Sequence, residues 1–165
     1  MDSAEPMDDN LRVSLRPVGA DDEEFLFRVF AASHEQLALV PLEGEQLVAL
    51  VRMQFTAQRL DYERRFPGAE HSVVLRNDVP AGRIWVAWLD DQIRLLDIAI
   101  LPEYRNAGIG SALIRSLQAE AGRSGKPLRH MVAVINASAI RFYKRMGFET
   151  IDDVGTHYLM EWTPA

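Results

Sequence analysis

From Leu95 to Ser111 the chain reads LLDIAILPEYRNAGIGS. This segment predicts an apolar strand, a short polar turn and a Gly-x-Gly that opens a helix. Such a turn directs backbone N–H groups outward at a helix N-terminus, where the partial positive charge of the helix attracts phosphate. Gly108 and Gly110 have no side chain to hold a phosphate at a distance, and Arg105 adds a fixed positive charge at the rim. The segment therefore predicts a turn that binds a pyrophosphate.

Composition limits the classes of protein to which the chain can belong. With 165 residues, 48% hydrophobic and 25% charged, it predicts one soluble globular domain over residues 11–165. Residues 1–10 are acidic and polar, unlike a secretory signal, which predicts a disordered tail and a cytoplasmic location. The absence of cysteine excludes disulfides and a thiolate nucleophile. A net charge of −6 argues against a nucleic-acid partner, and no apolar run is long enough for a membrane span.

Hydrophobic periodicity predicts the order of the elements. Strands are expected at 11–16, 71–76, 83–89, 92–100 and 128–135, with a final hairpin of 148–151 and 157–162. Helices are expected after a cap at Asp21 or Asp22 and at 43–66, 108–121 (ended by Gly122) and 137–146 (capped by Asn136). Residues 77–82 are expected to form a turn. A meander followed by strand–helix–strand–helix predicts an α+β fold, with one mixed, mostly antiparallel sheet between helices.

Three kinds of phosphate-binding turn can be compared with the Gly-x-Gly. A Walker A loop needs a Lys after its last Gly, and none follows here. A dinucleotide fingerprint needs a third small residue where Leu113 stands, and an acidic residue near Lys126-Pro127. The remaining pattern, Arg/Gln-x-x-Gly-x-Gly/Ala, is met by Arg105 to Gly110.

With that pattern, residues 71–148 resemble the GNAT superfamily of acyl-CoA-dependent N-acyltransferases. The strand Ile98-Ala99-Ile100 before the loop is similar to the family's, and residues 136–148 resemble its second signature, Asn…Tyr…Gly-Phe. Asn136 and Tyr143 are seven positions apart, so they lie on one face of the expected helix. An amide and a phenol on one face suit a narrow acyl-pantetheine channel.

The resemblance implies a role for each matched residue. It implies acetyl-CoA as the acyl donor, no metal, and a single N-acetyltransferase domain. The pantetheine would pair with the backbone of Ile98, Ala99 and Ile100 and contact Asn136. The pyrophosphate would bind to Arg105, Asn106, Ala107, Gly108, Ile109, Gly110 and Ser111. Tyr143 would contact the cofactor and act as the catalytic acid that protonates the departing thiolate.

The general base and the acceptor are left open by the sequence. In some relatives a glutamate serves as the base on the strand before the loop, but that position falls near Arg94 here. Strand alternation places Asp97 on the other face, and Glu70, His71 and His34 are further candidates. The acceptor pocket is expected within residues 25–66. There the arginines of 59–65 either meet an acidic acceptor or form a solvated helix face.

We therefore expect an N-acetyltransferase that moves an acetyl group to a primary amine of a small molecule or peptide. Because no cysteine is available for an acyl-enzyme, the amine is expected to attack the thioester directly in a ternary complex. The alternative is a catalytically silent acyl-CoA sensor or regulatory module. A homodimer remains open.

Overall fold

The computed structural model describes residues 11–34 and 39–165, so the predicted tail at 1–10 lies outside the described residues. The strands are β1 (Val13–Pro17), β2 (Glu70–Arg76), β3 (Val79–Trp88), β4 (Ile93–Ile100), β5 (Leu128–Ala133), β6 (Glu149–Asp153) and β7 (His157–Trp162). The helices are α1 (Glu23–Ser33), α2 (Gly44–Arg65), α3 (Ile109–Ser124) and α4 (Ala137–Arg145), with 3₁₀ turns η1 (Ala20–Asp22) and η3 (Pro102–Tyr104).

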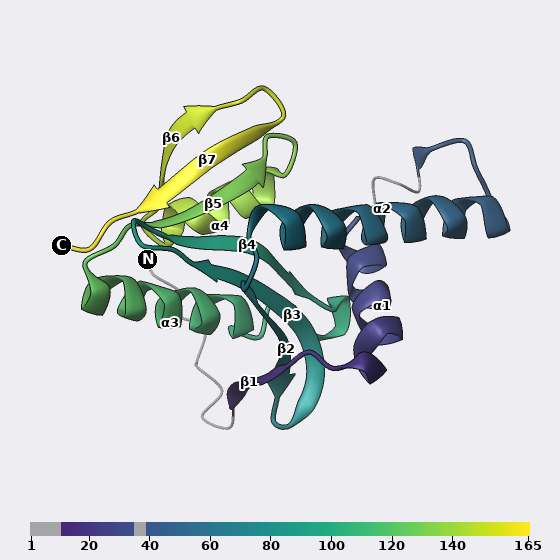
Figure 1. Cartoon of the computed structure of the whole chain (residues 1–165), viewed down its shortest axis with the longest axis horizontal. Helices are drawn as coiled ribbons and strands as arrows, with labels where there is room; N and C mark the ends of the chain where they lie inside the picture. Colours follow the sequence, from purple (N-terminus) through teal and green to yellow (C-terminus); the bar gives the residue numbers. More distant parts are fainter. Residues whose placement is uncertain (1–10, 35–38) are drawn as a thin grey trace.

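The strands form one seven-stranded sheet in the order β1-β2-β3-β4-β5-β7-β6 (Figure 1). Neighbours are antiparallel except β4 and β5, which run parallel because α3 crosses between them. This arrangement confirms the mixed, mostly antiparallel sheet and the α+β class. No helix among the described residues is long and apolar enough to cross a membrane.

Two differences from the predicted element boundaries have a direct physical cause. The turn before β3 is two residues long, because Asn77 and Asp78 take positive φ angles of 48° and 68°, as a two-residue hairpin requires. Residues 79–82, expected in the turn, therefore belong to β3. Helix α3 runs past Gly122 to Ser124 and is closed by Gly125 at φ 67°. Gly122 lacks a positive φ, so its backbone continues the helix.

The core lies on both faces of the sheet. The larger apolar cluster joins β3, β4 and β5 to α3 and α4, and it includes Ile84, Ile93, Leu113, Leu128 and Tyr143. Smaller clusters on the opposite face join the sheet to α1 and α2. Helices thus cover each face, as the alternation of apolar residues in the strands requires.

Two irregularities of β4 shape the middle of the sheet. The register with β3 shifts between Trp85, opposite Asp97, and Val86, opposite Leu95, so Leu96 is the extra residue of a β-bulge. The pairing of β4 with β5 is confined to Ile93–Leu95 against Leu128–His130. Beyond Leu95 the two parallel strands separate, and the sheet opens between β4 and β5.

Candidate active site

A cavity of about 520 Å³ lies on the α3–α4 side of this opening. Its wall combines the end of β4, the loop before α3 and one face of α4. Among its lining residues are Ile98, Ile100, Arg105, Asn106, Gly108, Ile109, Gly110, Ser111 and Tyr143, all predicted from the sequence. We call it the donor cavity. It brings nine of the predicted site residues together from three separate segments.

The Gly-x-Gly turn is built as a phosphate-binding turn requires. Asn106 and Gly108 take positive φ angles of 60° and 86°, and Gly108 is the N-cap of α3 without any capping side chain. The first N–H groups of a helix have no intrahelical partner, so those that open α3 stay available at the cavity wall. The Arg105 Nε donates to the carbonyl of Ile100 at 2.9 Å, which fixes the arginine across the base of the turn.

Tyr143 lies at the inner end of the donor cavity and is 3% exposed. Its ring meets His130, Phe142 and Phe148 edge-on, at centroid distances of 5.0, 5.1 and 5.3 Å. Burial, with a smaller contribution from Asp97, raises the pKa of the Tyr143 phenol above its usual value. The phenol is therefore protonated at neutral pH, which is the state that a proton donor needs.

Three predicted residues do not line the cavity. Ala99 points to the α1 side, where it packs in a cluster with Val29 and Leu101. Asn136 is the N-cap of α4, and its side-chain oxygen accepts from the backbone N–H of Ala139 at 3.1 Å. Ala107 is absent from the lining residues of the donor cavity. The predicted contact between Asn136 and pantetheine therefore stays a prediction.

A second cavity, of about 270 Å³, lies on the α2 side of the same strands. Its residues come from α2, β4, β5 and β7: Gln58, Asp61, Tyr62, Arg65, Phe66, Arg94, Leu95, Leu96, Met131 and His157. We call it the α2-side cavity. The Leu95–His130 pair forms the boundary between the two cavities, since the His130 ring binds the Leu95 carbonyl at 2.9 Å and also touches Tyr143.

The bulge at Leu96 overturns one prediction. Simple alternation places Arg94 and Asp97 on opposite faces, but the extra residue brings both to the α2 face. Arg94 lines the α2-side cavity, and the Asp97 carboxylate accepts from Arg83 Nε at 2.7 Å. Another branch of Arg83 donates to Gln58 of α2 at 2.5 Å. Asp97 is thus committed to a buried ion pair, which removes it as a free general base.

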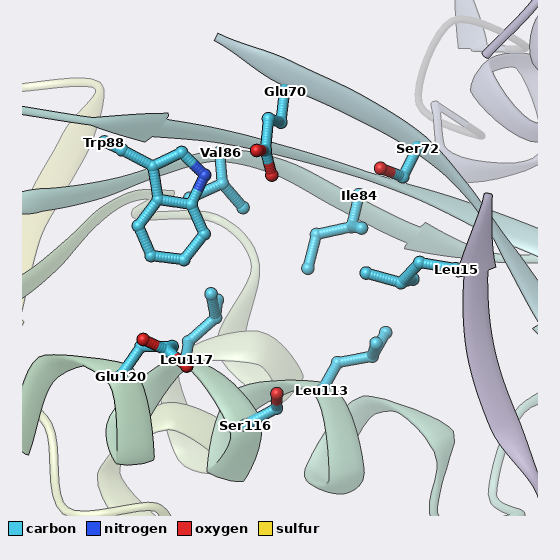
Figure 2. Close-up of a pocket in the computed structure, with 10 residues that line it drawn as sticks. All are labelled: Leu15, Glu70, Ser72, Ile84, Val86, Trp88, Leu113, Ser116, Leu117 and Glu120. Carbon is cyan, nitrogen blue, oxygen red and sulfur yellow. The ribbon is translucent and has the colours of Figure 1, made fainter. Parts of the chain in front are cut away.

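The other candidates for the base lie away from the opening. Figure 2 shows Glu70 beside Trp88 in a separate cavity of about 350 Å³ between β1–β3 and α3. His71 stacks on Trp85 at 4.0 Å, and burial lowers its pKa to about 4. The His34 ring binds the carbonyl of Phe30 at the end of α1. None of the three lines either cavity at the β4–β5 opening.

Half of the residues that line the α2-side cavity fall within 25–66, where the sequence predicts an acceptor pocket, but sequence reasoning missed those from β5 and β7. Tyr62 donates to the carbonyl of the bulged Leu96 at 2.9 Å, and Met131 and His157 approach from β5 and β7. Burial raises the pKa of Tyr62 to about 12. The distances along the chain between these residues left no spacing pattern, because only the sheet order brings β7 next to β5. On the donor side, the unpredicted residues Tyr104, Ser138, Ala139, Phe142 and Arg145 complete the wall.

Comparison with known proteins identifies the class of this domain. The family model "Acetyltransferase (GNAT) domain" matches residues 67–150, so the chain belongs to the GNAT acetyltransferase family. A curated relative is an uncharacterized N-acetyltransferase of Methanocaldococcus jannaschii, 43% identical over 54 residues. That match covers 32% of this chain and 24% of the relative, so the chain spans about a quarter of that protein's length.

Solved structures of similar fold include two with CoA groups. The PaiA N-acetyltransferase of Thermoplasma acidophilum, in complex with coenzyme A, has a TM-score of 0.71 at 20% identity, covering 92% of this chain and 99% of that one. Naa50 of Arabidopsis thaliana, in complex with the bisubstrate analogue CoA-Ac-MVNAL, has a TM-score of 0.58 at 19% identity, with coverages of 92% and 98%. At identities of 20% and 19%, these structural similarities show a common fold only.

Proposed function

We propose that the protein is an acetyl-CoA-dependent N-acetyltransferase that acts on a primary amine by direct attack in a ternary complex. The observation that carries this proposal is the donor cavity, which joins a phosphate-binding turn to a buried phenol across the opening in the sheet. CoA-based donors are supported by the CoA and bisubstrate complexes of proteins with this fold.

The donor cavity offers a binding surface to each part of acetyl-CoA in turn, from the pyrophosphate to the thioester. The N-terminus of α3 offers N–H groups to the pyrophosphate. Where β4 leaves β5, its edge has no strand partner, so the pantetheine amides can pair with it as an added strand does. The thioester would then lie near Tyr143, at the inner end of the cavity.

In the proposed reaction, the amine and the thioester meet from opposite sides of the opening. The amine approaches from the α2 side and attacks the thioester carbonyl, which forms a tetrahedral oxyanion that a backbone N–H of β4 would stabilise. Collapse of this intermediate breaks the carbon–sulfur bond, and Tyr143 gives its proton to the departing thiolate. A primary amine with a pKa near 10.4 is mostly protonated at pH 7, so removal of its proton costs about 4–5 kcal/mol. The general base stays unassigned.

A second function competes with this one. The described residues place no free carboxylate at the opening, since Asp97 is paired with Arg83 and Asp61 with two arginines. An acyl-CoA sensor without turnover would have the same donor cavity. Release of free thiol from acetyl-CoA in the presence of an amine library separates the two functions, because a sensor binds the donor and releases none.

The donor site is tested by the variant Gly108→Asp. It places a carboxylate at the phosphate-binding turn and a side chain at φ 86°, so we expect the acetyl-CoA affinity to fall at least about 100-fold. Gly155→Asp is the matched control, because Gly155 also has a positive φ, 93°, in open space between β6 and β7. Calorimetry gives both affinities. Equal acetyl-CoA binding by the two variants would contradict the assignment of the turn.

A further inference from the structure

The α2-side cavity contains a cation that no side chain of the described residues neutralises. Arg94 is half-buried in β4 and lines this cavity. Its guanidinium forms no hydrogen bond or ion pair with any residue in the described ranges 11–34 and 39–165. An arginine removed from water without a partner costs free energy, and an anionic group that enters the cavity would recover it.

The other charged residues of the cavity do not supply that anion. Asp61, the acidic residue of the lining, is shared between Arg64 and Arg65, at 3.1 Å from each. Glu161, across β5 and β7, accepts from Arg129 Nε at 2.8 Å. Asp97 is held by Arg83. The acidic groups near Arg94 therefore each have an arginine of their own, and the cavity keeps an excess positive charge.

Electrostatics around Arg94 agree with the geometry. Burial lowers the pKa of Arg94, and the neighbouring Arg65 and Arg129 lower it further. Arg129 is the register partner of Arg94 on β5, so two cations stand side by side where the strands pair. A bound anion would relieve both the loss of hydration and this repulsion.

The position of the cavity connects the charge to the reaction. Leu95 and Leu96 form part of its lining, and the strands separate just after Leu95. Tyr143, which lines the donor cavity, contacts His130, whose ring binds the Leu95 carbonyl. A molecule held by Arg94 would therefore lie beside the strands at the point where they separate. A volume of about 270 Å³ suits a group of amino-acid size.

We propose that the α2-side cavity binds an anionic group of the acceptor, a carboxylate or a phosphate, with Arg94 as its main partner. This inference rests on the proposed acetyltransferase function and names the substrate class: an amine that also carries a negative charge. The planar guanidinium matches either anion with two parallel hydrogen bonds.

The test uses matched pairs of small amines that differ in charge. β-Alanine is compared with β-alaninamide, and phosphoethanolamine with ethanolamine, by calorimetry at saturating CoA, which has no acetyl group to transfer. We expect the wild-type protein to bind the anionic member of at least one pair about 10-fold more tightly or better. The pair that shows the preference distinguishes a carboxylate from a phosphate.

Three variants decide whether Arg94 causes the preference. Arg94→Met keeps the length and apolar stem of the side chain and should abolish the preference, and Arg94→Glu should reverse it. Arg123→Met removes an exposed arginine at the far end of α3 and should leave the preference unchanged. Thermal unfolding shows that each variant is folded. Comparison between variants cancels the different amine pKa values of the paired ligands.

The outcomes separate this inference from the proposed function. Equal affinity within both pairs, no measurable binding of either anionic amine, or a preference that persists in Arg94→Met would each overturn the anion site. CoA affinity, measured in the same proteins, should be the same in the wild type and in Arg94→Met. If the wild type fails to bind CoA at all, the proposed function itself is wrong.

Discussion

The two sides of the β4–β5 opening are lined by different kinds of chemical groups. The donor side combines the glycine turn of Gly108 and Gly110 and the ring of Tyr143 with two arginines, Arg105 and Arg145. The α2 side is made of charged and polar side chains, among them the buried Arg83–Asp97 pair. A site made of backbone groups can bind any ligand that contains the CoA scaffold. A site made of side chains can change its ligand when single residues are replaced. The comparison teaches why the donor of this protein is easier to infer than its acceptor.

The largest effect on the free energy of unfolding is expected for the buried ion pair on the α2 side. Asp97→Asn leaves Arg83, which is 1% exposed, without its counter-charge. Breaking a buried ion pair in this way should lower the free energy of unfolding by about 3–5 kcal/mol. Urea unfolding measures the change. Asp61→Asn, which breaks exposed ion pairs on α2, should cost less than about 1 kcal/mol. Equal costs would remove the distinction between buried and exposed charges on this side.

The next effect concerns turnover on the donor side. Tyr143→Phe keeps the packed ring and removes the proton donor, so kcat should fall about 100-fold while the affinity for acetyl-CoA stays within about two-fold. Initial rates of thiol release and calorimetry measure the two quantities. Phe142→Leu, a change in the neighbouring ring, should alter the donor affinity more than kcat. A Tyr143→Phe protein with wild-type kcat would exclude the phenol as the acid.

A smaller effect is expected for close backbone packing behind the donor side. A Cβ added to Gly82 would lie 2.2 Å from the Ala99 carbonyl, so Gly82→Ala forces β3 away from β4. We expect a loss of about 2 kcal/mol in the free energy of unfolding and weaker CoA binding. Gly122→Ala, in open space on α3, should instead stabilise by about 0.5–1 kcal/mol. A neutral Gly82→Ala would show that β4 can shift freely.

The smallest effect is a pH dependence on the α2 face. His71 has its pKa lowered to about 4 by burial, with Arg83 and Arg59 adding to the effect and Asp97 and Asp22 opposing it. Because the unfolded chain binds this proton near pH 6.5 and the folded chain does not, stability is full above pH 6.5 and falls as the pH drops toward 4.

Replacement by a ring that cannot titrate isolates this contribution. Between pH 7 and pH 5.5, His71→Phe should lose about 1 kcal/mol less free energy of unfolding than the wild type. Urea titrations at both pH values measure the difference. The buried His130, whose pKa is also lowered by burial, remains in the variant, so a residual slope is expected. An unchanged slope would show that His71 does not contribute to the pH dependence.

Much of the donor side was predictable because its signals are local. The turn from Arg105 to Ser111 combines glycines and a helix start within seven residues, and the structure gives left-handed angles to Asn106 and Gly108. Tyr143 was found because residues 136–148 resemble the second signature of the family. The Asn77-Asp78 turn was predicted at the right place but too long, because residues 79–82 pair with β2 and β4 in a way that turn propensities do not report.

The α2 side was not predictable, because one extra residue changes which side chains share a face. Counting from the Gly-x-Gly assigned Arg94 and Asp97 to opposite faces, and the bulge at Leu96 brings them to the same one. A bulge depends on the fit between two strands, not on the sequence of one. His157 and Met131 likewise join the cavity through the strand order β5-β7.

The sequence by itself determined the family, the class of sheet and the glycine turn that opens α3, since each was inferred from residues close together in the chain. Only the tertiary structure decided that Asp97 pairs with Arg83 and that the Arg94 side chain has no hydrogen-bond or ion-pair partner among the described residues. It also decided that His130 connects Leu95 of the α2-side cavity to Tyr143 of the donor cavity. The physical reason is that conformational preference acts over a few residues. The pairing of charges and the opening between strands depend instead on elements that meet only when the whole sheet has formed.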